Sequence, residues 1–327
     1  MNELTVCPST LKAGYNTFCP AAKRSFLGGK TVSHILPYDS LSSDGAALEN
    51  QGRLSLSGAQ EKYSAVIDHG VFRLTKVGEQ GTFILKPKLT AFLNREFSPA
   101  NENLTMQIAS QVYGIETAPN AVCFTKTGEP VYVTKRYDIR PDGTKIQQED
   151  FASLAGLSRD THGRNYKYDA SDYVDLAGLI RKYIPAWRIE LLKYFDLMLF
   201  NFVFANGDAH IKNFSVLQTN YGDYRLSPAY DLINTLIHIP NGSVFALSKG
   251  LYPGWNRELG VSGKDFLHFA ELIGIDSKAA GREIDCFCAE YPLTESLIQN
   301  SFLNDELKEE YRVIYKTRIN SYLKSRE

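Results

Sequence analysis

The chain has 327 residues, of which 43% are hydrophobic and 22% charged, and its formal net charge is -1. This composition is ordinary for a soluble globular protein with a sizeable core, and the length allows one large domain or two smaller ones. A domain whose main task is to coat nucleic acid is normally more basic, so the charge balance argues against that class of protein.

Apolar runs and cysteines also exclude some classes. The longest apolar run, residues 191–205, is interrupted by Lys193, Asp196 and Asn201 and falls short of the ~20 residues that span a bilayer. The N-terminus lacks the basic and apolar regions of a secretory signal. Five cysteines, an odd number, do not form a disulfide framework in a chain of this length. We therefore expect a cytoplasmic protein that does not enter a membrane.

The first fifty residues show the least regular pattern. Cys7 and Cys19 each stand beside a proline, like two halves of a zinc knuckle, but Thr10 occupies the position of a second cysteine in the first half. A structural zinc site needs four ligands, so two packed, reduced thiols are the alternative to a metal site. Residues 40–52 are polar and glycine-rich, and they are interpreted as a linker.

Residues 53–67 alternate like a strand, turn at Ser57-Gly58-Ala59 and resume as a strand. Such a small-residue turn between antiparallel strands lets backbone N–H groups approach a phosphate closely, as the glycine-rich loop of a kinase does. An ordinary hairpin is the alternative. Further strands of the same antiparallel sheet are predicted at residues 71–74, 82–85, 121–125 and 131–138.

Lys86 follows the predicted strand 82–85 directly. A lysine at the end of an apolar strand can point its ammonium at the α- and β-phosphates of ATP, although Pro87 also suits an edge position. An amphipathic helix is predicted to begin near Pro99. Glu102, in its first turn, could pair with Lys86 or simply complement the helix dipole.

Strands give way to helices near Tyr137. This change predicts a boundary between a strand-rich lobe over residues 50–136 and a helical lobe over residues 137–327, with residues 1–49 as an extension and linker. The strand 131–138 would run out of the sheet into the connector where kinase hinges bind adenine.

Several helices are predicted in the second lobe. One opens at residues 147–151, and the others cover residues 173–183, 187–205, 265–275, 278–291 and 305–323. The helix 187–205 is apolar nearly all round at its C-terminal end and should form the buried spine of this lobe. The polar, basic stretch 158–170 is expected to form a loop beside the cleft. Cys286 and Cys288 form a C-x-C without partners and are expected in the core.

The spine helix leads into Asn-Gly-Asp-Ala-His-Ile-Lys-Asn, residues 206–213, called the catalytic loop below. Asp208 and Asn213 stand in the order D-x-x-x-x-N, the spacing of a kinase catalytic loop, where the Asp accepts the proton of the substrate hydroxyl and the Asn holds Mg²⁺. A hairpin predicted over residues 214–227 would bring Asn213 level with Asp231. An amide oxygen and a carboxylate facing one cavity suit Mg²⁺, which prefers oxygen ligands.

Each of these residues also has a simpler interpretation. Asp208 could be a turn residue, Asn213 a strand cap, His210 a core histidine and Asp231 the N-cap of residues 232–237. Their joint occurrence, in this order and with a hairpin between them, favours a phosphoryl-transfer site.

With these motifs identified, the chain resembles a HipA-type serine/threonine kinase, the toxin of bacterial toxin–antitoxin modules. The residues that carry the resemblance occur in family order over residues 50–240: Ser55-Leu56-Ser57-Gly58-Ala59-Gln60-Glu61-Lys62, Ile84-Leu85-Lys86-Pro87, Asn101-Glu102, Lys135-Arg136-Tyr137-Asp138, Gln148-Glu149-Asp150, residues 206–215 and Tyr230-Asp231-Leu232. The strings G-A-Q-E-K and G-D-x-H-x-K-N-F-S are the most specific of these.

The resemblance implies an α+β, two-lobed, protein-kinase-like fold, with a small, mostly antiparallel β N-lobe carrying one helix and a larger, mostly α-helical C-lobe. ATP and Mg²⁺ would bind between the lobes. It implies catalytic roles for Asp208, Asn213 and Asp231, metal binding by Asn213 and Asp231, and an ion pair of Lys86 with Glu102. The implied ATP-binding residues are Ser57, Gly58, Ala59, Gln60, Glu61, Lys62, Lys86, Lys135, Arg136, Tyr137, His210, Ile211, Lys212, Asn213 and Tyr230.

Members of this family phosphorylate a serine in their own phosphate loop, which here implies Ser55, with Ser57 as a second candidate. A phosphate there adds about -1.5 to -2 charge and would repel the γ-phosphate of ATP. About fifty residues precede the loop, as in the short toxins, in which a small HipS-like protein supplies the missing subdomain. Implied partners are this subunit, a helix-turn-helix antitoxin that contacts DNA, and a protein substrate such as an aminoacyl-tRNA synthetase.

Two further functions remain open from the sequence. D-x-H-x-x-N also occurs in antibiotic kinases, so a small-molecule phosphotransferase is an alternative; transfer of phosphate to a protein rather than a drug would discriminate the two. The other alternative is an ATP-binding co-repressor scaffold without essential catalysis, which would keep its function after Asp208→Ala.

Overall fold

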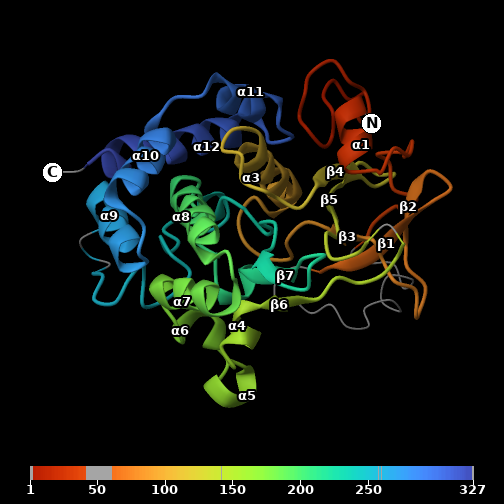
Figure 1. Ribbon diagram of the computed structural model, residues 1–327. Coiled ribbons are helices and arrows are strands. Elements are labelled where there is room, and N and C mark those ends of the chain that lie inside the picture. The colour runs from red at the N-terminus through yellow and green to blue at the C-terminus, as the bar shows by residue number, and fades with distance from the viewer. Residues whose placement is uncertain (1–2, 42–60, 141, 257, 259, 326–327) are drawn as a thin grey trace.

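The computed structural model describes residues 3–41, 61–140, 142–256, 258 and 260–325. Figure 1 shows a strand-rich part with the N-terminal segment on one side and a helical part on the other, with a small sheet between them. The predicted α+β organisation is therefore confirmed. The linker predicted at residues 40–52 and the first strand and turn of residues 53–60 fall almost wholly outside the described residues.

A five-stranded antiparallel sheet forms the strand-rich part, with the order β2-β1-β3-β5-β4. Its strands are β1 (Tyr63–Asp68), β2 (Val71–Leu74), β3 (Phe83–Lys86), β4 (Asn120–Phe124) and β5 (Pro130–Lys135). Each lies within one or two residues of a strand predicted from alternation, apart from the longer C-terminal end expected for β5. Pairing of Lys86 with Tyr132 places the end of β3 beside the middle of β5.

The N-terminal segment packs against this sheet through α1 (Pro20–Ser25) and the turn that follows it. The ring of Phe26 lies 6.0 Å from that of Phe72 and 5.5 Å from that of Phe83. Residues 3–41, which looked irregular in the sequence, therefore contribute to the core under the sheet.

Cys7 and Cys19 are free, buried thiols within this packing. The Cys19 sulfur accepts the backbone N–H of Ala22 at 3.5 Å and so caps α1. Among the described residues, no group of three or more His, Cys, Asp and Glu side chains is arranged to hold a metal ion. The cysteines thus act in packing and capping here.

Helix α3 (Ser98–Gln111) lies between the five-stranded sheet and the helical part, and its residues are buried from Ser98 to Ala109. The expectation of an amphipathic helix was wrong, because both faces are covered. Several buried polar groups of α3 have partners on either side: Asn103 Nδ2 donates to Asn120 Oδ1 at 2.8 Å, and the hydroxyls of Thr105 and Tyr311 lie 2.9 Å apart. Pairing removes most of the cost of burying these groups.

A three-stranded sheet in the order β6-β7-β8 follows, with β6 (Gln148–Asp150), β7 (Ser215–Gln218) and β8 (Tyr224–Leu226). Residues 147–151 were predicted to open a helix, but β6 pairs with β7 and only the short α4 (Phe151–Leu154) follows. The Asp150 side chain accepts the N–H of Ser153 and caps α4. The predicted hairpin over residues 214–227 is present as β7 and β8.

The expected loop at residues 158–170 contains two short helices, α5 (Arg159–His162) and α6 (Tyr166–Asp169). A capping box between Ser158 and Thr161 fixes the first turn of α5. This local capping explains why a polar stretch without apolar periodicity still becomes helical.

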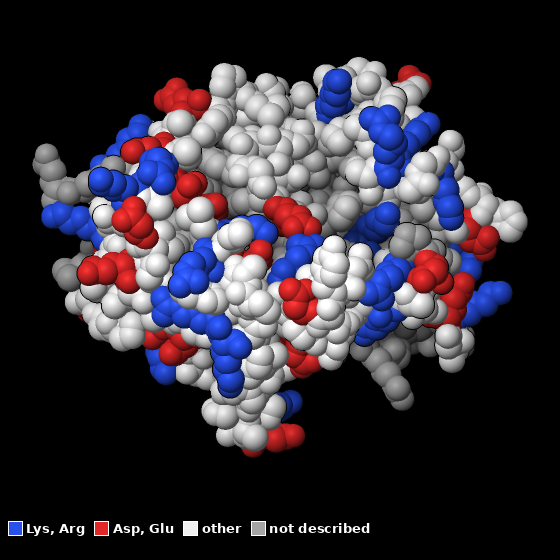
Figure 2. Space-filling view, in the orientation of Figure 1, with Lys and Arg blue, Asp and Glu red and all other residues white. Residues whose placement is uncertain are grey.

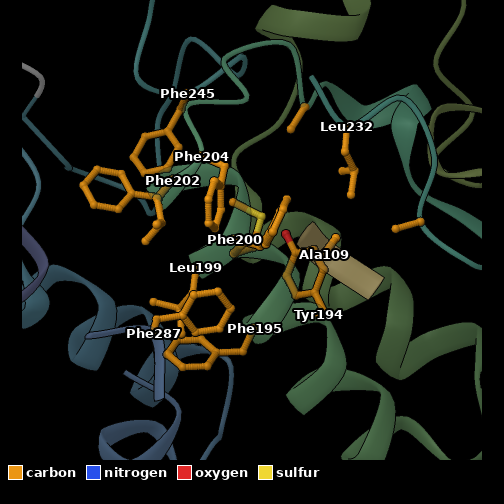
Figure 3. Packing of buried hydrophobic residues seen from close by; sticks show 14 of the residues in the cluster. Ala109, Tyr194, Phe195, Leu199, Phe200, Phe202, Phe204, Leu232, Phe245 and Phe287 are labelled. Atoms are coloured by element: carbon orange, nitrogen blue, oxygen red, sulfur yellow. The ribbon is translucent and has the colours of Figure 1, made fainter. Parts of the chain in front are cut away.

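The helical part is built around α8 (Trp187–Val203), whose C-terminal half is buried almost completely, as its apolar sequence predicts. Figure 3 shows Tyr194, Phe195, Leu199 and Phe200 of this helix packed together with Phe287. The other helices of this part are α7 (Tyr173–Tyr183), α9 (Gly263–Leu272), α10 (Ser277–Cys288), α11 (Pro292–Asn300) and α12 (Asp305–Thr317), which continues as a π-helical segment, Arg318–Leu323.

The prediction of a buried C-x-C pair was wrong in part: Cys286 is exposed and Cys288 half-buried, and Phe287 between them enters the core. Successive helical residues point in different directions, so Phe287 enters the core fully while Cys288 packs against it only in part and Cys286 faces solvent.

Figure 2 shows Lys and Arg interspersed with Asp and Glu over the visible face. In the described part of the chain, no helix has the length and apolar character needed to cross a membrane.

Candidate active site

Lys86 and Glu102 form an ion pair between the end of β3 and the first turns of α3. Lys86 Nζ lies 2.5 Å from Glu102 Oε1, and each side chain is only 3% exposed. Lys86 also forms an ion pair with Asp231 Oδ1. Burial by itself would lower the pKa of Lys86, but the charges of Asp231 and Glu102 outweigh it and raise this pKa. Lys86 is therefore a cation fixed between two carboxylates.

Asp231 lies beyond β8 in a left-handed backbone conformation, with φ of +56°, which is uncommon for a residue other than glycine. Its second carboxylate oxygen, Oδ2, accepts a hydrogen bond from Lys62 Nζ at 3.2 Å. Burial opposes its charge, but Lys62 and Lys86 together hold the pKa of Asp231 well below its usual range. Asp231 is not the helix cap considered above, because the Asn234 side chain caps the following turn. We call Lys62, Lys86, Glu102 and Asp231 the ion cluster.

Phe204 and Ala205 link the end of α8 at Val203 to the catalytic loop, and Ala205 also has a positive φ of +54°. Gly207 follows, and its N–H donates to Thr235 Oγ1 at 3.0 Å. A Cβ atom at Gly207 would lie 2.4 Å from the backbone oxygen of Ser243. The close approach of this neighbouring backbone is the reason that the loop needs glycine before Asp208.

Asp208 and Asn213 are joined by the fold of the loop. Asn213 Nδ2 donates to the backbone oxygen of Asp208 at 2.9 Å, and the N–H of His210 donates to the same oxygen at 2.8 Å. The D-x-x-x-x-N spacing thus closes into a compact turn. The side-chain oxygen of Asn213 has no hydrogen-bond partner among the described residues, so it can serve as a metal ligand.

The residues between them have different surroundings. His210 is 2% exposed, burial lowers its pKa, and its Nδ1 has no hydrogen-bond partner among the described residues. Ile211 is buried in the core, so any contact with ATP would come from its backbone. Lys212 Nζ binds Asp150 Oδ2 at 3.1 Å, which links the loop to the cap of α4.

The predicted hinge residues lie where β5 ends. Arg136 forms an ion pair with Asp138 at 2.6 Å, and the Tyr137 hydroxyl accepts a hydrogen bond from Gln148 at 3.1 Å. The rings of Tyr137 and Tyr230 lie 6.1 Å apart, and the Tyr230 hydroxyl donates to the backbone oxygen of Lys212 at 2.9 Å. These two tyrosines therefore connect the predicted hinge to the catalytic loop and to the segment after β8 that contains Asp231.

Of the predicted phosphate loop, the structure describes only Glu61 and Lys62; Ser55, Ser57, Gly58, Ala59 and Gln60 lie outside the described residues. Sequence reasoning missed Tyr168, whose hydroxyl donates to Asp208 Oδ1 at 3.2 Å. Asn101 was quoted with Glu102 in one motif of the resemblance but was given no role; in the structure its amide binds the backbone of Asn234.

The donor chemistry fits Mg²⁺ bound together with ATP. Asn213 and Asp231 offer amide and carboxylate oxygens, the ligands that a hard cation prefers alongside phosphate oxygens. Both oxygens of Asp231 have lysine partners, so a metal ion would compete with Lys62 or Lys86 for them.

Comparison with known proteins assigns the family. The model of the HipA-like C-terminal domain matches residues 54–293, which contain the catalytic loop and all four members of the ion cluster. The chain belongs to this family. The structure is also similar to HipA in the "Shewanella oneidensis MR-1 Toxin Antitoxin System HipA, HipB and its operator DNA complex", with a TM-score of 0.61, 19% identity, and coverage of 82% of this chain and 64% of that one. The predicted two-lobed, kinase-like fold is thus confirmed.

Two relatives carry kinase names. "Putative kinase Y4mE" of Sinorhizobium fredii is 34% identical over 193 residues, 57% of this chain and 43% of that protein. A "Putative kinase" of Haemophilus influenzae is 26% identical over 251 residues, 70% of this chain and 69% of that protein. The chain therefore spans less than half of the first relative and about two thirds of the second.

Proposed function

We propose that this HipA-like chain is an ATP- and Mg²⁺-dependent serine/threonine protein kinase. The observation that carries the proposal is the ion cluster, in which Lys86 at the end of β3 binds both Glu102 of α3 and Asp231, the aspartate that follows the β7–β8 hairpin. A Lys–Glu pair and a metal-binding Asp on either side of a catalytic loop are the parts that a protein kinase needs. Family membership supports the same assignment.

In this proposal each residue has one task. Lys86, oriented by Glu102, binds the α- and β-phosphates of ATP, and Asn213 and Asp231 hold the metal. Bound Mg²⁺ would neutralise charge on the phosphates. Asp208 accepts the proton of the acceptor hydroxyl, and the adenine lies against the hinge, Lys135 to Tyr137.

Lys62 needs a change of partner for this arrangement to form. In the structure its ammonium is bound to Asp231 and its side chain is only 7% exposed. Phosphate oxygens of ATP would offer Lys62 a new anionic partner, and Asp231 would then be free to bind the metal.

Regulation and partners are proposed from the family. Ser55, or else Ser57, accepts phosphate in the protein's own phosphate loop, where its charge would oppose ATP binding. The protein acts in the cytoplasm as the toxin of a toxin–antitoxin pair, its substrate is a translation-related protein such as an aminoacyl-tRNA synthetase, and a helix-turn-helix antitoxin, a HipS-like subunit or both restrain it. The Shewanella protein is described in a complex with HipB and operator DNA, which supports an antitoxin partner and an indirect link to DNA here.

The test is incubation of the purified protein with Mg²⁺-ATP, followed by intact and peptide mass measurement, beside the variants Asp208→Ala and Asp231→Ala. We expect phosphate on Ser55 or Ser57 in the wild type only. ATP binding without transfer to the loop or to any added protein would contradict the proposal and favour the scaffold function.

A further inference from the structure

Tyr168 of α6 contacts the catalytic aspartate directly. Its hydroxyl donates to Asp208 Oδ1 at 3.2 Å, and within the described parts of the chain it is the one hydrogen-bond partner of that carboxylate. Burial, and next the charge of Asp208, raise the pKa of Tyr168, so the phenol keeps its proton at neutral pH. A neutral hydroxyl donor therefore faces the proposed base.

Core packing does not account for this position. Tyr168 is half-buried and is not part of the hydrophobic core that fills the helical part. Its ring instead forms a T-shaped contact with that of His210, with centroids 5.3 Å apart, and the ammonium of Lys167 lies 4.8 Å from its ring centroid. Its contacts are thus polar or charged and lie at the catalytic loop.

The backbone around Tyr168 is held in place. The N–H of Ser248 donates to the backbone oxygen of Tyr168 at 2.9 Å, and Lys249 Nζ donates to that of Ala170 at 2.8 Å. Just beyond, the Tyr173 hydroxyl donates to the backbone oxygen of Ala209 at 2.9 Å. Two tyrosines from this stretch therefore bind consecutive residues of the catalytic loop, one at a side chain and one at the backbone.

We propose that Tyr168 is a positioning residue for phosphoryl transfer, a role that rests on the function proposed above. Its hydroxyl fixes one oxygen of the Asp208 carboxylate and leaves the second oxygen for the acceptor hydroxyl. In the transfer step the acceptor oxygen bonds to the γ-phosphorus, the bond from that phosphorus to the leaving oxygen of ADP breaks, and the acceptor proton passes to Asp208. Tyr168 keeps its own proton throughout and acts by orientation.

The experiment compares Tyr168→Phe with wild type, using the full chain, Mg²⁺-ATP and the phosphate acceptor found by mass measurement. Loss of a hydrogen bond to a charged group should lower kcat about tenfold while the KM for ATP stays within about twofold. Tyr252→Phe is the matched control, because the Tyr252 hydroxyl also donates to an aspartate, Asp265, at 2.6 Å but lies outside the proposed site.

A second comparison separates positioning from a structural role. Tyr168→Phe is combined with Asp208→Asn, and since Tyr168 acts through Asp208, the double variant should be no slower than Asp208→Asn alone. Two results would overturn the positioning role while the kinase function stands. One is an unchanged kcat in Tyr168→Phe; the other is a double variant whose kcat falls below that of Asp208→Asn by the same factor by which Tyr168→Phe falls below wild type. Equal transfer by wild type and Asp208→Asn overturns the assignment of Asp208 as the base and this inference with it, whereas ATP binding without any transfer by the wild type overturns the kinase function itself.

Discussion

The candidate active site places its charges in two different environments. In the ion cluster, Lys62, Lys86 and Glu102 are at most 7% exposed, and Asp231, 25% exposed, binds both lysines. At the catalytic loop, Lys212 and its partner Asp150 are 27% and 23% exposed. A buried charge that loses its partner is costly, whereas a partly exposed one is rescued by water. Stability and function should therefore be inseparable in the ion cluster and separable in the catalytic loop.

The largest effect is expected from Glu102→Ala. Lys86 would lose Glu102 but keep Asp231 as a partner, so the free energy of unfolding should fall by about 3 kcal/mol, the lower end of the cost of breaking a buried pair. Urea unfolding measures this loss. Glu116→Ala is the control, since its pair with Arg225 is 34% and 55% exposed and should cost less than about 1 kcal/mol. Equal losses in the two variants would break the comparison.

A partly buried carboxylate that forms no ion pair within the described residues provides a third environment for this comparison. Asp196 of α8 is partly buried, its Oδ1 has no hydrogen-bond partner among the described residues, and burial together with the charge of Glu283 raises its pKa to about 7. The folded state then binds the Asp196 proton more tightly than the unfolded state does, so this group lowers stability as the pH rises from about 4 to about 7.

A rise of about three pKa units corresponds to about 4 kcal/mol, and solvent at this partly exposed carboxyl reduces the effect, so Asp196→Asn should unfold like the wild type near pH 4 and be more stable by about 1–2 kcal/mol at pH 8. Urea unfolding at the two pH values measures the difference. Asp231 has the opposite pH dependence. Its pKa is lowered in the folded state, so its charge stabilises the fold at pH values above its pKa in the unfolded chain, and this stabilisation is lost as the pH falls. A constant difference between variant and wild type at both pH values would contradict the assignment.

The smallest effect is expected from Asp150→Asn. An asparagine still caps α4, so the change removes mainly the partly exposed ion pair with Lys212 and should cost about 0.5–1 kcal/mol. Thermal unfolding at low and high salt provides the check. Salt screens an ion pair, and the Debye length is only about 3 Å at about 1 M NaCl, so the unfolding temperatures of wild type and variant should converge there. A salt-independent difference would show that capping dominates.

The sequence predicts well where the signal is local. Alternation located the strands from Tyr63 to Lys86, and apolar spacing located α7 and α8, because a period of two or of 3.6 residues needs no distant partner. The order of Asp208, Asn213 and Asp231 likewise identified the loops that the family match contains. Their roles, and the lobe boundary at Tyr137, stay predictions.

Contacts between distant segments could not be predicted in the same way. The burial of α3 from Ser98 to Ala109 depends on Tyr311 and on the loop at Asn234, which are more than one hundred residues away along the chain. The lysines on both oxygens of Asp231 come from β3 and from the segment before β1. Tyr168 precedes Asp208 by 40 residues in a stretch without apolar periodicity, so only the fold shows their contact.

The most direct test of the central claim compares binding with transfer in Asp208→Asn. The catalytic loop and the ion cluster have separate tasks in this account, so the variant should bind Mg²⁺-ATP with wild-type affinity by calorimetry and unfold at the wild-type urea concentration. Its rate of phosphate transfer should fall by about 10²–10⁴-fold, the usual contribution of a general base. Transfer at the wild-type rate would contradict the assignment of Asp208 as the base and with it the proposed kinase site.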